Sequence, residues 1–258
     1  MSETGIGASV VRKEDFRFLT GKGHYTDDIN RPGQAHAFFI RSPHAHAEIK
    51  KIDASAAQSM PGVLGIFTGD DIAADKIGGL ICGWMIHSKD GSPMKAGAHP
   101  ALAQGKVRYV GDHVAVVIAE TLELARIAAE QVKVEYKVLP AVVDMEAAVR
   151  AGSAVVHDVA QDNRVYQWHL GDQAAADAAF KKAAHVTRLD IVNNRLVPNA
   201  MEPRAAIGDY DSGADSFTLY TTSQNPHVAR LVLSAFIGIA PEHKISVIAP
   251  DVGGGFVS

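Results

Sequence analysis

Cysteine is nearly absent from this sequence: Cys82 is the single cysteine among 258 residues. One thiol cannot form an internal disulfide, and it is too few for a cysteine-based zinc or iron–sulfur site. An excess of basic charge is missing as well, because 25 lysines and arginines stand against 29 acidic residues and the net charge is −4. The chain therefore lacks the positive charge that drives binding to nucleic acid phosphates.

Long apolar runs are also missing. The longest mostly apolar stretch, residues 231–240, has about ten residues, whereas a helix that spans a bilayer needs about 20. The N-terminal residues lack the apolar core of a secretory signal peptide. We therefore expect a cytoplasmic protein with no membrane span and no nucleic-acid partner. Fingerprints of a serine nucleophile, a Walker loop or a dinucleotide site do not occur either, so these motifs identify no function.

What the chain has is the composition of a folded protein, with 47% hydrophobic and 21% charged residues. Runs of β-prone residues predict strands at residues 35–41 and 63–68, and two further strands within residues 107–119 that are joined at Gly111-Asp112. Thr121 is expected to begin a helix whose apolar face, spaced i, i+3, i+4 and i+8, consists of Leu124, Ile127, Ala128 and Val132. Residues 75–105 carry many glycines, prolines and histidines with little periodicity, and they predict an irregular surface segment.

The pattern breaks around residues 152–164, and we place a domain boundary there. The sequence thus predicts an α+β fold with two domains, residues 1–152 and residues 153–258. Beyond the boundary we expect strands at residues 165–170, 185–193 and 204–210, and an amphipathic helix at residues 172–184 with Ala175, Ala179 and Phe180 facing inward.

The last forty or so residues predict a strand–helix–strand unit. Residues 217–222 and 245–249 have the character of strands, and Asn225 followed by Pro226 is typical of a helix start. If the two strands share a sheet they are parallel, and their carboxyl ends meet at one edge. Ligands of α/β sheets bind at such an edge.

Two features follow these strands and are candidates for a binding site. Gln224 comes after the first strand, and the glycine run Gly253–Gly255 comes after the second. Consecutive glycines let the backbone approach a ligand closely and present its N–H groups. The alternative is that Gln224 is a polar loop residue and that the glycines form only a turn. Spacing by itself does not exclude this alternative.

Three other polar residues are weaker candidates. His44 and His46 lie on one strand face, as two metal ligands would, but the sequence offers no evident third ligand. Hydrogen-bonded or solvated histidines are therefore the simpler interpretation. Glu202 is either a site carboxylate or a partner in a salt bridge at a strand edge.

Several blocks of sequence, in the right order, resemble the molybdenum-binding large subunits of the xanthine dehydrogenase family. The greatest likeness is to the subunits of the aerobic carbon monoxide dehydrogenase type. Residues 11–33 (VRKEDFRFLTGKGHYTDDINRPG) resemble the opening of these subunits. Four blocks resemble the family's α/β hammerhead domain: residues 39–57, 60–71, 107–121 and 132–144. Residues 220–256, which contain SQNPHVARL and PDVGGGF, resemble the start of its molybdopterin-binding domain.

The resemblance implies an α/β hammerhead domain followed by an incomplete α/β molybdopterin-binding domain. It also implies roles for single residues. Gln224 matches the glutamine that donates a hydrogen bond to an oxo ligand of molybdenum. Gly254, Gly255 and Phe256 match the segment that contacts the pterin and the metal's oxygen ligands, and Gly253 precedes them in the same segment. No catalytic residue and no metal ligand is implied within this chain.

The implied cofactor is the molybdenum–molybdopterin cytosine dinucleotide. The implied partners are an FAD-binding medium subunit and a small subunit with [2Fe–2S] clusters, besides the remainder of the large subunit. Family large subunits are roughly three times as long as this chain, and their general-base glutamate lies near their C-terminus. We therefore expect the N-terminal portion of a molybdenum hydroxylase large subunit, an oxidoreductase by family, that is inactive alone. The alternatives are a non-catalytic assembly or interaction module and the relic of a truncated gene.

Overall fold

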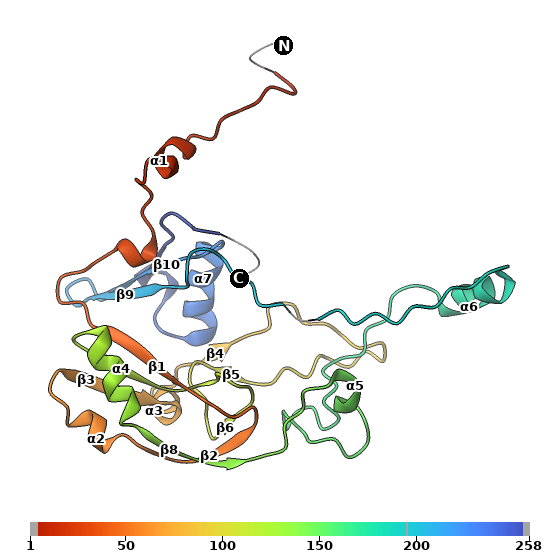
Figure 1. Cartoon of the computed structure of the whole chain (residues 1–258), viewed down its shortest axis with the longest axis horizontal. Helices are drawn as coiled ribbons and strands as arrows, with labels where there is room; N and C mark the ends of the chain where they lie inside the picture. Colours follow the sequence, from red (N-terminus) through yellow and green to blue (C-terminus); the bar gives the residue numbers. More distant parts are fainter. Residues whose placement is uncertain (1–4, 195, 255–258) are drawn as a thin grey trace. The chain divides into compact units, whose positions relative to one another are not determined.

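The structure of the protein, a computed structural model, describes residues 5–194 and 196–254 (Figure 1). The chain forms two compact units. The larger unit contains residues 34–195 and 236–238, and the smaller unit contains residues 1–33, 196–235 and 239–258. Helices and strands are mixed in both units, which confirms the predicted α+β class. The domain boundary at residue 152 stays a prediction.

The first sheet of the larger unit has three antiparallel strands. Its order is β1-β7-β3, so β7 is the central strand. The bounds are His36–Arg41 for β1, His113–Ala119 for β7 and Val63–Thr68 for β3. All three strands were predicted from their β-prone sequences. Two helices pack on this sheet, α2 (Ser55–Gln58) and α4 (Leu122–Glu130).

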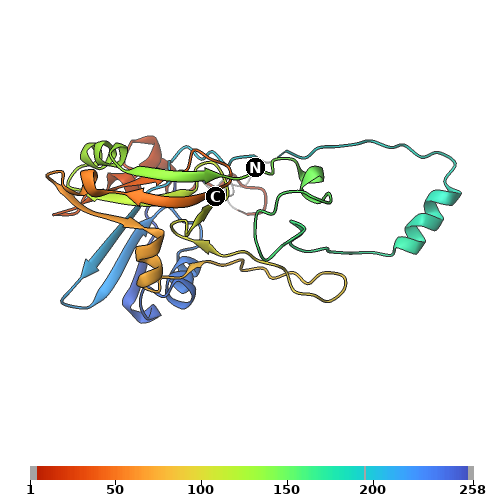
Figure 2. The same cartoon turned by 90° about the horizontal axis from the view of Figure 1, so that it is seen from below.

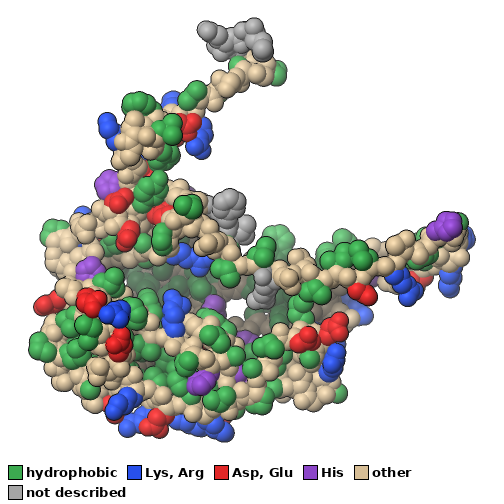
Figure 3. Space-filling view, in the orientation of Figure 1, with side chains coloured by type: hydrophobic (Ala, Val, Ile, Leu, Met, Phe, Trp, Pro, Cys, Tyr) green, Lys and Arg blue, Asp and Glu red, His purple; other side chains and the backbone are tan. Residues whose placement is uncertain are grey.

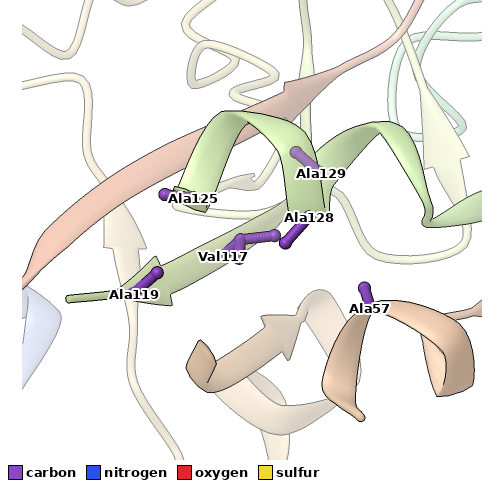
Figure 4. Packing of buried hydrophobic residues seen from close by; sticks show 6 residues of the cluster. All are labelled: Ala57, Val117, Ala119, Ala125, Ala128 and Ala129. Atoms are coloured by element: carbon purple, nitrogen blue, oxygen red, sulfur yellow. The ribbon is translucent and has the colours of Figure 1, made fainter. Parts of the chain in front are cut away.

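The helix α4 begins where the sequence predicts it. The side chain of Thr121 accepts a hydrogen bond from the backbone N–H of Leu124 at 3.1 Å, and this satisfies one free donor of the first turn. Its buried side chains, Ala125, Ala128 and Ala129, are small, which lets the helix lie close to the sheet. They form a buried cluster with Ala57 of α2 and with Val117 and Ala119 of β7 (Figure 4). Ile127, predicted on this apolar face, is instead exposed.

The second sheet of the larger unit is also antiparallel, in the order β6-β2-β8. The bounds are Lys106–Val107 for β6, Ala47–Asp53 for β2 and Lys133–Val138 for β8. A second buried cluster lies beside it, formed by Ala47, Ala103, Val107 and Val114. The helix α3 (Gly69–Ala74) follows the first sheet and is capped by hydrogen bonds from Thr68 to the Asp71 carboxylate, both at 2.7 Å.

The segment of residues 75–105 is mostly irregular, as the sequence predicts. Its regular structure is the short hairpin of β4 (Gly79–Leu80) and β5 (His99–Pro100). Toward the end of the unit, the short helix α5 (Met145–Ala148) begins at Asp144, whose carboxylate accepts a hydrogen bond from the Ala147 N–H at 2.6 Å.

Two predicted strands are wrong. Residues 165–170 and 185–193 form no strand, and every described residue from 164 to 194 is exposed. The predicted helix between them does form, as α6 (Gln173–Lys182), but it buries no residue. Ala175, Ala179 and Phe180 therefore do not face inward, and Phe180 is 64% exposed. Strands need a neighbouring edge for their backbone hydrogen bonds, and none of the described strands pairs with these segments.

Figures 1 and 2 both show α6 at the far end of two extended stretches. Apolar side chains stand along these stretches in the space-filling view (Figure 3). An isolated helix of ten residues is marginal in water. We therefore expect backbone amides of residues 170–194, those of α6 included, to exchange with solvent near the rate of an unfolded chain. Hydrogen exchange read by mass spectrometry measures this, with β7 as the protected internal reference. Slow exchange throughout α6 would contradict the expectation.

The smaller unit contains a three-stranded sheet in the order β11-β10-β9. The bounds are Ala206–Asp211 for β9, Ser216–Thr221 for β10 and Ile245–Ile248 for β11. β9 and β10 form an antiparallel hairpin, whereas β10 and β11 are parallel, with Phe217 opposite Ile245 and Tyr220 opposite Ile248. The predicted parallel arrangement is confirmed. The unit also contains α1 (Asp15–Leu19) and the 3₁₀ helices η1 (Thr26–Asp28) and η3 (Glu242–Lys244).

The helix α7 (Pro226–Val232) connects β10 to β11 and contacts β11. A π-helical turn, η2 (Leu233–Ile237), continues it. Asn225 stands at the cap position with Pro226 after it, as predicted, but its side chain makes no capping hydrogen bond. The helix start thus depends on Pro226, whose fixed φ suits the first turn. None of the helices in the described ranges combines the length and apolar character that crossing a bilayer requires.

Candidate cofactor-binding site

The parallel pair β10 and β11 brings two of the predicted features to one edge of the sheet. Gln224 lies three residues beyond the end of β10, and the glycine segment begins five residues beyond the end of β11. Gln224 is exposed, and Gly253 and Gly254 are half-buried. Gly255 and Phe256, the other two predicted cofactor residues, lie outside the described residues. The carboxyl edge of this sheet is therefore the candidate site.

Glu202 connects the two chain segments at this edge. One carboxylate oxygen, Oε1, accepts a hydrogen bond from the Thr222 hydroxyl at 2.8 Å. The other, Oε2, accepts from the backbone N–H of Gly253 at 2.6 Å, and the Glu202 N–H donates to the Gly253 carbonyl at 3.3 Å. Within the described residues, no ion pair includes Glu202. The interpretation of Glu202 as a salt-bridge partner is therefore replaced by a bridge to two neutral donors.

The glycine segment packs so closely that side chains would not fit. A Cβ atom added to Gly253 would lie 2.4 Å from the Cβ of Glu202, far inside van der Waals contact. Gly254 has φ = +138°, which residues with a side chain rarely adopt, and its added Cβ would lie 3.2 Å from that of Ala200. The need for these two glycines thus comes from the close approach of Ala200 and Glu202 and, at Gly254, also from the positive φ. The spacing of the glycines alone could not reveal this contact.

Asp251 connects the N-terminal segment to the loop that contains the glycine segment through hydrogen bonds, and sequence analysis did not predict this role. Its carboxylate accepts hydrogen bonds from the Arg17 guanidinium and from the His24 N–H, the latter at 2.8 Å. The Asp251 N–H in turn donates to the His24 carbonyl at 3.0 Å. The hydrogen bond from Arg17, followed by that from His24, lowers the pKa of the Asp251 carboxyl below its usual value. Sequence gave no signal for this pair, because its members are more than two hundred residues apart.

The lowered pKa of Asp251 makes the attachment of the N-terminal segment depend on pH. The ionised carboxylate favours the attached state above the ordinary aspartate pKa of about 4. This contribution is lost as pH falls through the lowered pKa, because the protonated group no longer attracts Arg17. We expect protection of the His24 amide to decrease over that acidic range. Amide exchange followed by NMR measures it. In Asp251→Asn, protection should be weaker and independent of pH over the same range, and equal pH dependence in both proteins would contradict the assignment.

A buried hydroxyl completes the network of the smaller unit. Thr26, at the start of η1, is fully buried, and its Oγ1 lies 3.4 Å from the Oγ1 of Thr222. Thr222 thus lies between Thr26 and Glu202, and the hydroxyl of Thr222 donates to the carboxylate. The segment after β10 is consequently held from two sides.

The histidines considered as metal ligands lie in the larger unit and have other partners. His46 is buried, and its Nδ1 lies 3.0 Å from the carbonyl oxygen of Pro140. The His44 ring meets the Tyr136 ring edge-on, with the centroids 5.0 Å apart. Among the described residues no three or more histidine, cysteine, aspartate or glutamate side chains are grouped as metal ligands would be. Both histidines therefore contribute to packing.

The larger unit also contains a cavity of about 540 Å³. Lys95, Lys106 and Arg108 contribute to its wall, together with His99 and His157. Lys106 pairs with a carboxylate at 3.2 Å and Lys95 with another at 3.5 Å, both from the same unit. Burial, and then the Arg108 charge, lowers the pKa of His157 and favours its neutral form. Two cations of this wall are thus neutralised internally, and we assign no ligand to the cavity.

The groups at the carboxyl edge of the smaller unit suit a ligand that is rich in oxygen. Gln224 offers carboxamide N–H donors, and the glycine segment offers backbone close to the surface. Both oxygens of the neighbouring Glu202 carboxylate already accept hydrogen bonds from protein donors. The edge therefore combines an exposed carboxamide with closely packed glycine backbone at the point where sheet ligands bind.

Comparison with known proteins identifies the family. Residues 20–140 match the model of the a/b hammerhead domain of aldehyde oxidase and xanthine dehydrogenase, and residues 156–256 match the molybdopterin cofactor-binding domain. The carbon monoxide dehydrogenase large chain of Afipia carboxidovorans is 37% identical over 265 residues. The nicotine 6-hydroxylase large subunit of Paenarthrobacter nicotinovorans is 38% identical over 253 residues. These alignments cover 98% and 97% of this chain, and 31% and 30% of the relatives.

Comparison with solved structures supports the same family. Quinoline 2-oxidoreductase from Pseudomonas putida 86 matches with a TM-score of 0.85 and 37% identity, over 97% of this chain and 31% of that one. A Cu,Mo carbon monoxide dehydrogenase matches with a TM-score of 0.81 and 34% identity, over 97% of this chain and 32% of that one. The chain therefore belongs to the xanthine dehydrogenase and aldehyde oxidase family of molybdenum-binding large subunits, and it spans about a third of the length of the relatives named here. This confirms the resemblance found in the sequence.

Proposed function

We propose that this chain is the N-terminal portion of a molybdenum hydroxylase large subunit and that it supplies part of the cage for the molybdenum–molybdopterin cytosine dinucleotide. The observation that carries the proposal is the joint placement of Gln224 and Gly253–Gly254 beyond the carboxyl ends of the parallel strands β10 and β11. Both family models match the chain, and the second one ends within the glycine segment. The relatives named above act as oxidoreductases, and the chain takes its reaction class from them.

The residues of this chain would bind and orient the cofactor. When bound, the molybdenum cofactor supplies the redox chemistry of hydroxylation. The Gln224 carboxamide donates a hydrogen bond to an oxygen atom of the cofactor and fixes its orientation. The glycine segment lets the backbone come close to the pterin, because no side chain stands between them. Phe256, predicted to complete the contact, belongs to the same segment. The general base is expected in the portion of the subunit that this chain does not contain.

Electrons must leave the cofactor after each reaction, and this chain offers no carrier for them. An iron–sulfur cluster needs four protein ligands, typically cysteine thiolates, whereas Cys82 is the single cysteine and is exposed. We infer that the chain works with an FAD-binding medium subunit and a small subunit with [2Fe–2S] clusters, in the cytoplasm. The relatives' names include carbon monoxide, nicotine and quinoline, so the substrate is sought with a panel of compounds.

The test compares the 258-residue chain with a large subunit of the relatives' full length that contains it, co-expressed with both partner subunits. Molybdenum is measured by mass spectrometry, and dye reduction is followed with carbon monoxide, nicotine, quinoline and xanthine. We expect about one molybdenum per full-length subunit and dye reduction with one of the compounds, and no turnover from the chain alone. Turnover by the chain alone would contradict its assignment as a portion. A full-length subunit without molybdenum would favour a non-catalytic assembly module.

A further inference from the structure

Glu202 is the residue at the candidate site whose side chain forms hydrogen bonds with two separate chain segments. It joins two segments that are distant in the sequence, since Thr222 is 20 residues after it and Gly253 is 51 residues after it. Its two carboxylate oxygens take one hydrogen bond each, at 2.8 Å from the Thr222 hydroxyl and at 2.6 Å from the Gly253 N–H. Its own N–H returns a third hydrogen bond to the Gly253 carbonyl at 3.3 Å. The side chain thus spans the edge of the sheet.

The chemistry of a carboxylate suits this bridge. An ionised carboxylate has two oxygens that only accept, so it receives two donors from different directions. Hydrogen bonds to an ionised acceptor are also stronger than those between neutral groups. A carboxamide in the same place has one oxygen for Gly253 and an N–H₂ group toward Thr222, whose hydroxyl can then accept instead of donate. Glutamine therefore retains the bridge in weakened form, and alanine removes it.

The bridge ends at the two elements that carry the proposed cofactor contacts. Thr222 is two residues before Gln224, and Gly253 is the first residue of the glycine segment. Close packing supports the same link, because the backbone of Gly253 approaches Glu202 so nearly that no Cβ fits between them. A group that is held in its binding geometry before the ligand arrives loses less conformational entropy on binding.

We propose that Glu202 is a positioning residue that fixes the Gln224 segment and the glycine segment relative to each other, so that both meet the cofactor together. This inference rests on the proposed function and extends it to a residue beyond the proposed cofactor contacts. Glu202 acts through Thr222 on one side and through the Gly253 amide on the other. Its effect is on the retention of the cofactor and not on a proton or electron of the reaction.

The first experiment needs no cofactor and uses the 258-residue chain. Amide exchange of Gly253 is followed by NMR in the original protein and in Glu202→Ala, Glu202→Gln and Thr222→Val. We expect protection of the Gly253 amide to fall about tenfold in Glu202→Ala and by less in Glu202→Gln. Thr222→Val leaves the Gly253 bond in place and should retain most of the protection. The matched control is Glu242→Ala, which removes an exposed glutamate of the same unit that pairs with Arg230 and should change nothing at Gly253. Equal protection in Glu202→Ala and the original protein would overturn the proposal.

The second experiment uses the full-length subunit with its partners. Molybdenum retained after dialysis is measured over time for the same variants. We expect Glu202→Ala to lose molybdenum at least about tenfold faster than the original, and Glu202→Gln to restore most of the retention. Unchanged retention in Glu202→Ala would overturn the positioning role. If the alanine variant does not fold, Thr222→Val and Glu202→Gln still test the bridge through intermediate losses. An original subunit without molybdenum would instead refute the proposed function, and the Gly253 exchange result would stand independently of it.

Discussion

Replacing Val117 with aspartate is expected to unfold the larger unit. Val117 is completely buried in the central strand β7, opposite Phe38 of β1 and Ile66 of β3. Its side chain points into the alanine cluster beneath α4 (Figure 4). A carboxylate at this point would have no donor and no water, and we expect a loss of at least about 3 kcal/mol of stability. Because folded domains have a total stability of roughly 5–15 kcal/mol, this loss removes much of it.

Urea denaturation followed by circular dichroism measures the change, as a lower midpoint of the main transition. The matched control is Val138→Asp, since Val138 is also a β-branched strand residue of the larger unit but is 62% exposed. An exposed substitution should alter the stability by less than about 1 kcal/mol. Equal midpoints for the two variants would mean that Val117 is not in a core that excludes water.

The larger unit could be predicted well because its signals are local. Thr121 caps α4 through a residue three positions away, and the strands β1, β3 and β7 have runs of β-prone residues within them. Burial of the small alanines then follows from the helix period. Each of these signals lies within a window of about ten residues, so the sequence shows it directly.

The failed strands have a different cause. Residues 185–193 have the alternation of a strand, but a strand forms only where another edge accepts its hydrogen bonds. Sequence alternation reports which side chains share a face and does not report whether a partner edge exists. For the same reason Ala175, Ala179 and Phe180 of α6 were predicted inward although no described element covers them. The helix α6 forms as predicted, but the predicted burial of its apolar face is wrong.

At the candidate site, too, the features with local sequence signals were predicted and those that depend on distant partners were not. The sequence places Gln224 and the glycines beyond two parallel strands, and that arrangement of the strands is observed. Glu202 was a candidate whose partners the sequence did not indicate, and Asp251 was given no role, because the partners of both residues are tens to hundreds of residues away. Asn225 shows the converse error. Its residue type and position are those of a cap, yet its side chain makes no capping bond, since Pro226 already suffices to start the helix.

Replacing Gln224 with alanine is expected to slow turnover of the full-length enzyme about 10- to 100-fold at equal molybdenum content. The change removes a carboxamide that, in the proposed function, donates a hydrogen bond to an oxygen atom of the cofactor. A hydrogen bond to a charged group contributes about 1.5–3 kcal/mol, and each 1.36 kcal/mol on the barrier is about tenfold in rate. The full loss is expected only if the hydrogen bond strengthens in the transition state. Folding should be nearly unchanged, because Gln224 is exposed in the segment that follows β10.

Dye reduction with the compound that the original enzyme oxidises measures this effect, after molybdenum has been determined in each preparation. The control is Asn225→Ala, a change of similar size at the next residue. Because the Asn225 side chain makes no capping bond to α7, its removal should cost less than the roughly 1 kcal/mol of a lost cap. Turnover of Asn225→Ala should therefore stay within about threefold of the original, which is less than 1.36 kcal/mol on the barrier. If Gln224→Ala retained full turnover at equal molybdenum, Gln224 would be a loop residue and the cofactor contact would have to come from elsewhere at this edge. If instead it lost molybdenum together with turnover, Gln224 would hold the cofactor in place without contributing further to the rate.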